Sequence, residues 1–556
     1  MEKTIYYNGV ILTLAEGDKE AAGVLVEEGI IQKVVYADTE SLLLENPDAQ
    51  IVDLQGNVLI PGFIDGHSHF LQNTLTLLYL DGRPSPLGKA DSVEELLKRL
   101  KEQLEDAKYK KQEYLFAWGY DEAVYPDHRI PTRWDLDQVT EKPLALTHAS
   151  GHNTLFNSAA LRLAGIGEDY VPPQGGSVGR SSDGRLTGIF YETAAREVLP
   201  KSQLDDQKVL EKGLDMVIHQ YISKGVTTAQ DGGTPKKWYD SVRDIVAAGR
   251  LPIDLVSYIM DLEPEEVLNT KESQNGTYVN RYRAAGLKIF LDGSPQAKTA
   301  WMSEPYFIPP ENEEPDYRGY GIYKDEEITE IFKKALTNRW QVNVHTNGDE
   351  AIEQFIRTYQ NAIEETGIME DLRPVSIHCQ TVREEQLDRM KELGFLASFF
   401  VDHTFYWGDY HEAYVLGTER ARRISPLASA LKRNISFSLH QDTPVTEQNP
   451  LFAVHNAVNR RTRSGKILGE EFCISPLEAL KAVTIHAAYQ IFEEDKKGSI
   501  EVGKLADFAI LNNNPLTVSP EKIKEISVLE TIKEGRTIYR SSEKFKITKG
   551  VGESSW

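Results

Sequence analysis

Two histidines one residue apart are the strongest local sign of chemistry in this sequence. His67 and His69 end the apolar stretch of residues 58–69, within the segment PGFIDGHSH. Side chains at positions i and i+2 point to the same side of a strand, so both imidazoles can approach one cation. Two hydrogen-bonded histidines at a strand end would give the same motif. Small residues at neighbouring positions leave room for a close approach: Gly62, Gly66 and Ser68.

Two further histidines end later apolar stretches. His345 closes the sequence VNVH and His378 closes VSIH. Alone, either would be a hydrogen-bonded residue at the end of a strand. The carboxyl ends of the strands in a parallel barrel converge on one face, and that face carries the chemistry. Together with the first pair, these histidines therefore predict one metal site with four imidazole ligands.

A single aspartate follows another predicted strand. Asp442 lies in SLHQDTP, after an alternation of apolar residues at positions 435, 437 and 439. A carboxylate at this place can contact the metal and carry protons for a bound water. The alternative is a turn aspartate before Thr-Pro.

A lysine lies between apolar neighbours in GLKIFLDG, residues 286–293. Lys288 must therefore point into a polar interior or form a buried ion pair. As an ammonium group it would repel metal ions, whereas addition of CO2 to its amine gives an anionic oxygen ligand able to bridge two metals. The alternative is an unmodified lysine paired with Asp292 or another carboxylate.

The middle of the chain alternates strands and helices, the pattern of a parallel α/β fold. Plausible helices cover residues 326–339 and 351–366. The gap between the first two strands is too long for one βα unit, so residues from about 71 to 205 are predicted to be an insertion, with a capped helix that starts at Ser92. Eight apolar runs are candidate barrel strands: residues 58–69, 225–233, 251–260, 286–293, 341–348, 374–380, 394–403 and 434–444.

Both ends of the chain have a different character from the middle. Short predicted strands separated by turn residues occupy the first sixty residues and the tail. This pattern predicts one small β-domain assembled from both termini. The predicted strands are residues 4–7, 10–14, 23–27 and 30–35, then 507–511, 528–533, 536–539 and 544–547.

These features together resemble the amidohydrolase superfamily. The resemblance is strongest to its third large family, which includes N-substituted formamide deformylase and proteins labelled exoenzyme regulatory protein. It covers nearly the whole chain. The segments that carry it are residues 61–69, GVTTAQDG at 225–232, 288–293 with Thr299-Ala300, HTNGD at 345–349, HCQ at 378–380, DTPV at 442–445 and GKLADF at 503–508.

The resemblance implies a (β/α)8 TIM barrel over residues 61–486 and a composite β-sandwich from residues 1–60 and 487–556. It places His67 and His69 after strand one, His345 after strand five, His378 after strand six and Asp442 after strand eight. It also implies that Lys288, after strand four, is the carboxylated bridge of a binuclear site. The chain departs from the family where Ile377 precedes His378 and where His440-Gln441 replaces a common Gly-Ser.

Three more histidines are candidates for the pocket. His403 follows FFVD at the expected end of strand seven. There it would bind the substrate, polarise the substrate carbonyl, or only contact and position other residues of the site. The side chain of His440 is expected to point to the same side of the chain as that of Asp442, where it can add a contact to the pocket. His152 lies in ASGHNTLFN, which resembles a family segment near the active site, and it is a candidate substrate contact or an ordinary loop histidine.

Composition limits the partners. Lys plus Arg is 62 and Asp plus Glu is 85, a formal net charge of −23, which argues against nucleic acid or an anionic membrane as a partner. The two cysteines and the lack of a signal-like start or an 18-residue apolar stretch predict a cytoplasmic protein without a membrane span. We expect a small-molecule substrate. The sequence does not determine the oligomeric state, and a homodimer is one of the alternatives.

The sequence thus predicts a metal-dependent hydrolase that acts on a carbon–nitrogen bond other than a peptide bond. One or two zinc ions, or other divalent metals, would activate water, with Asp442 as general base and then general acid. One alternative is deamination of a heterocyclic amine at the same site. Another is a catalytically silent regulatory or scaffold protein on the same fold.

Overall fold

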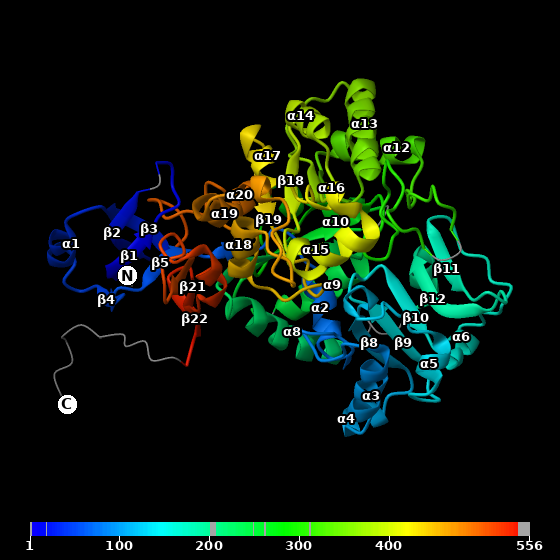
Figure 1. Ribbon diagram of the computed structural model, residues 1–556. Coiled ribbons are helices and arrows are strands. Elements are labelled where there is room, and N and C mark those ends of the chain that lie inside the picture. Colours follow the sequence, from blue (N-terminus) through cyan, green and yellow to red (C-terminus); the bar gives the residue numbers. More distant parts are fainter. Residues whose placement is uncertain are drawn as a thin grey trace.

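Eight parallel strands form the centre of the molecule (Figure 1). The computed structural model describes residues 3–17, 19–200, 207–247, 249–260, 263–310 and 313–542. Neighbouring strands pair in the order in which they follow along the chain. They are β6 (Phe63–Ile64), β13 (Val226–Thr234), β14 (Asp254–Ile259), β15 (Tyr282–Phe290), β16 (Gln341–Thr346), β17 (Val375–His378), β18 (Leu396–Phe399) and β19 (Phe437–Leu439).

The first and last strands approach each other at a glycine. A Cβ added to Gly66, just after β6, would lie 2.5 Å from Ser438 Oγ and 2.7 Å from the Leu439 carbonyl oxygen of β19. Only a residue without a side chain allows this approach. The predicted (β/α)8 barrel is confirmed, and each of its eight strands overlaps one of the predicted apolar runs. Six strands lie within their runs, whereas β13 ends one residue later and β15 begins four residues earlier than predicted.

Helices cover the outside of the barrel. The clearest example is α13 (Asp349–Thr366), whose buried apolar residues recur every three or four positions, the spacing of an amphipathic helix. It ends at Gly367, which adopts the left-handed conformation at φ 69°. Other helices around the strands are α8 (Gln207–Ile222), α9 (Lys236–Val246), α12 (Asp325–Asn338), α14 (Glu384–Glu392), α18 (Pro450–Asn459) and α19 (Pro476–Ala482).

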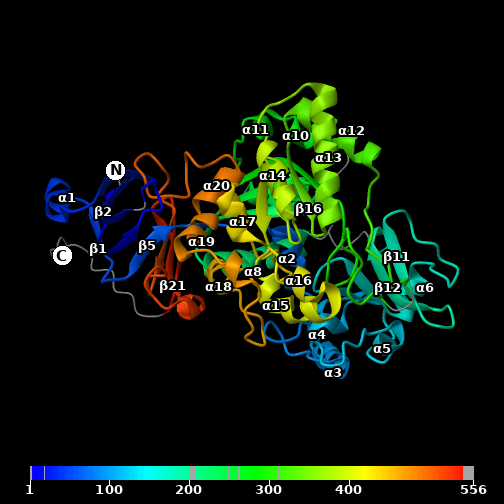
Figure 2. The ribbon, with the colours of Figure 1, turned by 45° about the horizontal axis from the view of Figure 1, so that its top comes forward.

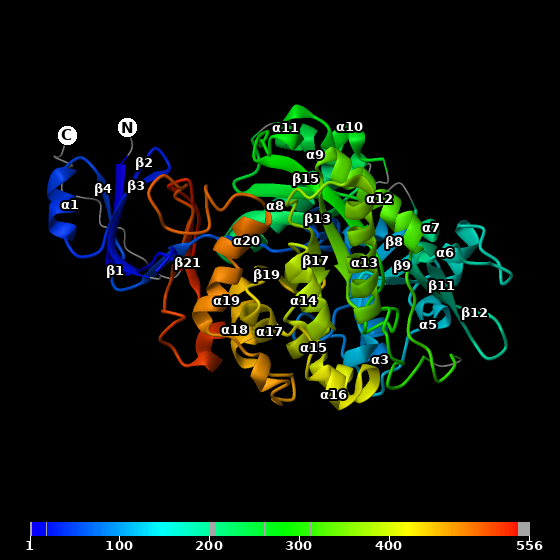
Figure 3. The ribbon, with the colours of Figure 1, turned by 90° about the horizontal axis from the view of Figure 1, so that it is seen from above.

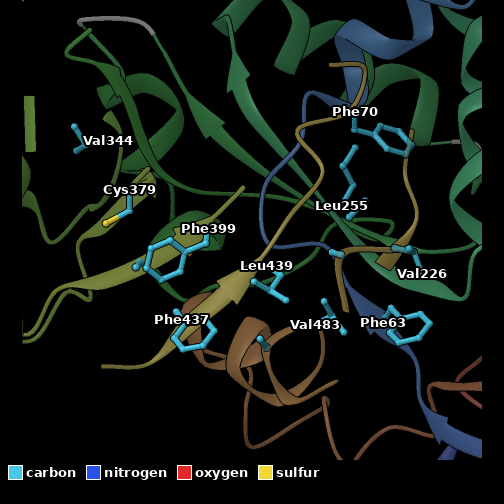
Figure 4. Close-up of a cluster of buried hydrophobic side chains, with 14 of the residues drawn as sticks. Phe63, Phe70, Val226, Leu255, Val344, Cys379, Phe399, Phe437, Leu439 and Val483 are labelled. Carbon is cyan, nitrogen blue, oxygen red and sulfur yellow. The ribbon is translucent and has the colours of Figure 1, made fainter. Parts of the chain in front are cut away.

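The largest apolar core joins the barrel strands to these helices. Figure 4 shows part of it, with Val226, Leu255, Phe399 and Leu439 gathered from four different strands. All four are at most 1% exposed, so burial of apolar area holds the strand ends in fixed positions. The described helices include none that is long and apolar enough to span a bilayer.

Both ends of the chain contribute to a second sheet. Its strand order is β22-β21-β20-β5-β1-β2-β3, with β4 paired to β1, in one hydrogen-bonded sheet. The exact domain boundaries and the arrangement of this domain as a β-sandwich stay predictions. The strand predicted at residues 544–547 lies outside the described residues. The strands are β1 (Lys3–Leu12), β2 (Glu20–Glu27), β3 (Ile30–Val35), β4 (Gln50–Asp53), β5 (Val58–Pro61), β20 (Phe508–Leu511), β21 (Val528–Lys533) and β22 (Arg536–Arg540).

The run predicted as the first barrel strand is divided between the two sheets. Residues up to Pro61 pair with β1 and β20, and Gly62 N–H still donates to the Asp507 carbonyl at 2.8 Å. From Phe63 onward the chain instead pairs with β13. A Cβ on Gly62 would lie 2.4 Å from Thr227 Cγ2, so the strand changes partners where there is no side chain.

Residues between β6 and β13 form a third sheet on the opposite side of the barrel from the terminal sheet (Figures 2 and 3). Its helix α3 (Val93–Leu104) begins as predicted, with Ser92 Oγ accepting from Glu95 N–H at 3.2 Å. The end of the predicted insertion at 205 lies outside the described residues. The strands are β7 (Leu80–Asp81), β8 (Leu115–Tyr120), β9 (Leu144–His148), β10 (Asn153–Phe156), β11 (Gly176–Arg180) and β12 (Leu186–Glu192).

A buried ionic cluster joins the barrel to the terminal sheet. Asp254, at the start of β14, accepts from Lys497 Nζ at 2.5 Å and Lys533 Nζ at 2.6 Å. Lys533 also contacts Asp507 at 2.7 Å. These four side chains are almost fully buried. Although burial opposes it, the charges of the two lysines lower the pKa of Asp254.

We predict that Asp254→Asn lowers the free energy of unfolding by about 3–5 kcal/mol at pH 7, because it leaves two buried ammonium groups without their shared carboxylate. Urea denaturation measures the change. Asp240→Asn is the matched control, since Asp240 forms an exposed pair with Lys236; its loss should stay below about 1 kcal/mol. Equal losses in the two variants would contradict the prediction.

The difference in free energy of unfolding between the wild-type protein and Asp254→Asn should also depend on pH. A carboxylate whose pKa is lower in the folded chain adds stability above its unfolded pKa, about 4 for Asp, and loses it as the pH falls toward the folded value. The stability gap between the wild-type protein and Asp254→Asn should therefore narrow below about pH 4. A gap that widens with acidification would overturn this assignment.

Candidate metal centre

The carboxyl ends of the barrel strands bring six predicted ligands together. His67 and His69 lie in the loop after β6, and Asp442 lies in the loop after β19. The other three come from neighbouring strands: Lys288 from β15, His345 from β16 and His378 from the end of β17. All six are buried except His69, which is partly exposed.

The donor atoms have the spacing of ligands around one cation. Asp442 Oδ1 lies 3.5 Å from His67 Nε2 and 3.4 Å from His69 Nε2. His378 Nε2 lies 4.0 Å from Asp442 Oδ2. Four ligands held about 2.1 Å from a zinc ion in a tetrahedron lie about 3.4 Å from one another. Asp442 Oδ1 is buried and lacks a hydrogen-bond partner in the described chain, as expected of an atom placed to bind an ion.

Burial keeps the imidazoles neutral. It is the largest cause that lowers the pKa of His67, His345 and His378 well below the usual value. Neutral imidazole is the form that ligates metals. Burial alone would raise the pKa of Asp442, but its side-chain contact with His69 lowers it, which keeps this carboxylate ionised.

Lys288 is a buried amine beside the histidines. Its Nζ lies 3.0 Å from His67 Nε2. The described chain places no carboxylate within 4 Å of Nζ, so the alternative of an ion pair with Asp292 is wrong; Asp292 contacts His345 instead. Burial lowers the pKa of Lys288 to about 7, so much of the amine is uncharged near neutral pH.

A carboxylate behind His345 fixes its orientation. Asp292 Oδ1 lies 3.1 Å from His345 Nδ1, which leaves Nε2 directed away from Asp292. The backbone N–H groups of Asn347 and Gly348 donate to Asp292 at 3.0 and 2.7 Å. Carboxylates in this position typically orient metal-ligating histidines and raise their basicity.

His440 occupies the corresponding place behind His378. His440 Nε2 lies 3.1 Å from His378 Nδ1, and His440 Nδ1 lies 2.8 Å from Ser398 Oγ. If His378 binds a cation through Nε2, its Nδ1–H donates to His440, and His440 Nδ1–H then donates to Ser398. His440 is fully buried with both nitrogens engaged. This geometry favours an orienting role over the predicted substrate contact.

Backbone conformation at the centre is unusual. His378 has φ 69° and Asp442 has φ 54°, both in the left-handed region that non-glycine residues seldom adopt. Gly232 of β13 packs against the first ligand, and a Cβ there would lie 1.9 Å from His67 Cε1. Strained residues of this kind cluster at functional sites, where the surrounding structure holds them in place.

A cavity of about 300 Å³ opens on the centre. Its lining includes His69, His345 and Asp442 from the barrel and His152 from the third sheet. His152 Nδ1 lies 2.9 Å from Glu192 Oε2, and its ring centre lies 4.9 Å from that of His345. The structure therefore brings His152 to the predicted pocket.

His403 does not line this cavity. Its ring centre lies 6.3 Å from that of His378 and 5.4 Å from that of Trp407, within a buried aromatic group. The residues that line the cavity within the described chain do not include it. The role of His403 in catalysis stays a prediction, and its position favours support of His378 over direct contact with substrate.

The sequence patterns did not predict a second buried cluster of potential metal ligands. Asp121, Glu122 and His148 have donor atoms within 4.8 Å of one another. However, the Ser150 backbone N–H donates to His148 Nδ1 at 3.0 Å, so the ring proton lies on Nε2, which faces Glu122 at 3.2 Å. A nitrogen that carries a proton has no free lone pair for a metal, so this arrangement does not match a metal site. The adjacent Asp-Glu pair was the only sequence signal.

Comparison with known proteins agrees with this geometry. Residues 50–539 match the family described as the amidohydrolase family. The amidohydrolase-like protein YtcJ of Bacillus subtilis is 26% identical over 97% of this chain and all of its own length. The N-substituted formamide deformylase of Arthrobacter pascens is 25% identical over 96% of this chain and 98% of its own.

A solved structure shares the fold. An uncharacterized metal-dependent hydrolase from Pyrococcus horikoshii superposes with a TM-score of 0.70 at 24% identity. The match covers 93% of this chain and 99% of that one. Because it spans nearly both chains, the similarity includes the terminal sheet and the third sheet as well as the barrel.

We predict that His440→Ala weakens metal binding by about 10- to 100-fold, because His378 loses the acceptor that fixes its tautomer. Chelator competition with purified protein measures the affinity. His440→Gln should restore most of it, since an amide can accept from His378 and donate to Ser398. His455→Ala removes another buried imidazole, far from the centre, and should leave the affinity unchanged. Full affinity in His440→Ala would refute the orienting role.

Two adjacent glycines provide a second test. Gly232→Ala should displace the His67 ring and lower metal affinity at least about 10-fold. In Gly233→Ala the nearest atom to the new Cβ is His69 Nδ1 at 3.4 Å, so the loss should be smaller. Metal content is measured by elemental analysis, and circular dichroism checks that both variants fold. The reverse order of losses would show that His67 does not bind the metal.

Proposed function

This chain belongs to the amidohydrolase family, and we propose that it is a metal-dependent hydrolase that cleaves a carbon–nitrogen bond of a small molecule. The bond is an amide, in an N-formyl or other N-acyl group. The observation that carries the proposal is that His67 and His69 converge on Asp442 Oδ1, at 3.5 and 3.4 Å, beside a cavity. The formamide deformylase among the relatives supports the choice of bond.

The centre would hold one or two divalent ions, with zinc the leading candidate because most of the donors are imidazoles. We assign Lys288 as a carboxylated ligand. Its support is a buried amine whose pKa is about 7, since the uncharged amine is the form that adds CO2. The full set of proposed ligands is His67, His69, Lys288, His345, His378 and Asp442.

The chain's own residues would handle the proton transfers. When bound, a divalent cation polarises water or a carbonyl oxygen and makes water a better nucleophile at neutral pH. Asp442, ionised and facing the cavity, accepts a proton from the attacking water. It then delivers this proton to the leaving nitrogen, so that the amine departs neutral.

His152 would contact the substrate beside this centre. Its Nδ1–H donates to Glu192, which leaves Nε2 as an acceptor. An amide N–H of the substrate is a suitable donor to it. Glu192 is itself fixed by Thr299 Oγ1, which donates to it at 3.1 Å. This chain of contacts holds the imidazole in one orientation.

The proposal predicts that metal-loaded protein hydrolyses at least one compound in a panel of N-formyl, N-acetyl and cyclic amides, and that chelation abolishes this activity. Detection of the carboxylic acid product distinguishes hydrolysis from deamination, which would release ammonia from aminated heterocycles. Less than about 0.2 equivalents of bound metal after zinc-supplemented expression would favour a catalytically silent scaffold.

Asp442→Asn tests the proton-transfer role. We expect turnover to fall by about 10²- to 10⁴-fold, the usual contribution of a general acid–base group. Metal should still bind, because the histidines and Lys288 remain. Elemental analysis on the same sample separates the two effects. Retained turnover in Asp442→Asn would refute the assigned role.

A further inference from the structure

Five aromatic side chains are among the residues that line the cavity beside the metal centre. Three aromatic side chains come from the segment between β6 and β13, and two come from the barrel. Tyr79 and Phe116 stack with their ring centres 5.4 Å apart. Such walls favour a flat apolar group. The five residues are Tyr79, Phe116, Trp118, Trp238 and Phe290.

One cation interrupts these walls. Arg196, in the short helix α7 (Thr193–Val198), is the single Lys or Arg among the described residues that line the cavity. Its guanidinium carbon lies 4.9 Å from the centre of the Phe290 ring. Lys288 Nζ lies 4.8 Å from the same ring centre. Arg196 and Lys288 therefore both lie beside the same aromatic ring, which places Arg196 close to the metal centre.

The guanidinium of Arg196 has no carboxylate partner in the described chain. The nearest candidate along the helix, Glu192, is engaged by His152 and Thr299. A guanidinium carries five donors, and stacking on Phe290 uses none of them. In a protein of net charge −23, an unpaired cation at a cavity supplies local attraction for an anion that the overall charge would repel.

We propose that the substrate of this cavity carries an anionic group, and that Arg196 binds it. This inference rests on the proposed amide hydrolysis. Carboxylate, phosphate and sulfonate all fit the planar fork of a guanidinium. Because Arg196 and Lys288 both lie beside the Phe290 ring, the anionic group would lie a few bonds from the scissile amide, and the aromatic and aliphatic lining residues would hold the apolar part.

Hydrolysis of matched amides tests the assignment. An amide with a free carboxylate is compared with its uncharged methyl ester. The wild-type protein should favour the carboxylate, and Arg196→Ala should lower kcat/KM for the carboxylate about 10-fold, mainly through KM, with little change for the ester. Equal losses for both compounds, or a wild-type preference for the ester, would overturn the inference.

Arg243→Ala is the matched control. Arg243 is also exposed and stacks on an aromatic ring, with its guanidinium carbon 5.8 Å from the Tyr239 ring centre, but it does not line the cavity. Its removal should leave the charge preference unchanged. Arg196→Lys should retain part of the preference, because it keeps the charge without the planar fork. A lost preference in Arg243→Ala would show that the effect is not local to Arg196.

Binding separates this inference from the proposed function. Calorimetry on the metal-loaded protein compares benzenesulfonate, an anion that coordinates metals weakly, with the uncharged methyl phenyl sulfone. We expect about a 10-fold preference for the sulfonate that disappears in Arg196→Ala. If this preference is found but the protein hydrolyses no amide, the proposed function fails and the anion subsite stands. No preference in the wild-type protein would refute the subsite.

Discussion

This structure depends on a group of potential metal-binding atoms, in His67, His69 and Asp442, that lie close together without forming hydrogen bonds to one another. Asp442 Oδ1 lies 3.5 Å from His67 Nε2 and 3.4 Å from His69 Nε2, at ligand spacing, and it lacks a hydrogen bond in the described chain. Burial of such groups costs free energy unless something compensates for it. A cation compensates directly, and the same burial keeps the imidazoles in the neutral form that a cation requires.

Three of the proposed ligands keep this geometry because neighbouring residues fix their orientation. Asp292 orients His345, His440 orients His378, and Gly232 leaves space for the His67 ring. These contacts come from three different parts of the barrel. The apolar core and the buried ionic cluster around Asp254 make the barrel rigid enough for that arrangement to persist.

The fold places the proposed ligands and much of the cavity wall on different segments of the chain. Barrel strands supply the proposed ligands, whereas the segment between β6 and β13 supplies much of the cavity wall, with His152 and Arg196. A change in this segment can alter what enters the cavity without moving the strand ends. The proposed anion subsite lies in this segment, and Arg196 and Lys288 both lie beside the Phe290 ring.

Local patterns in the sequence, together with the family resemblance, predicted the barrel, its eight strand regions and the residues that the structure brings together at the strand ends. Strand periodicity and the convergence of strand ends depend on residues near one another in sequence, so His67, His345 and Asp442 could be grouped without coordinates. The roles of His440 and Asp292, the division of residues 58–69 between two sheets and the lack of a carboxylate partner for Arg196 among the described residues could not be predicted in this way. Each depends on which distant side chain occupies the adjacent space, and only packing in three dimensions decides that.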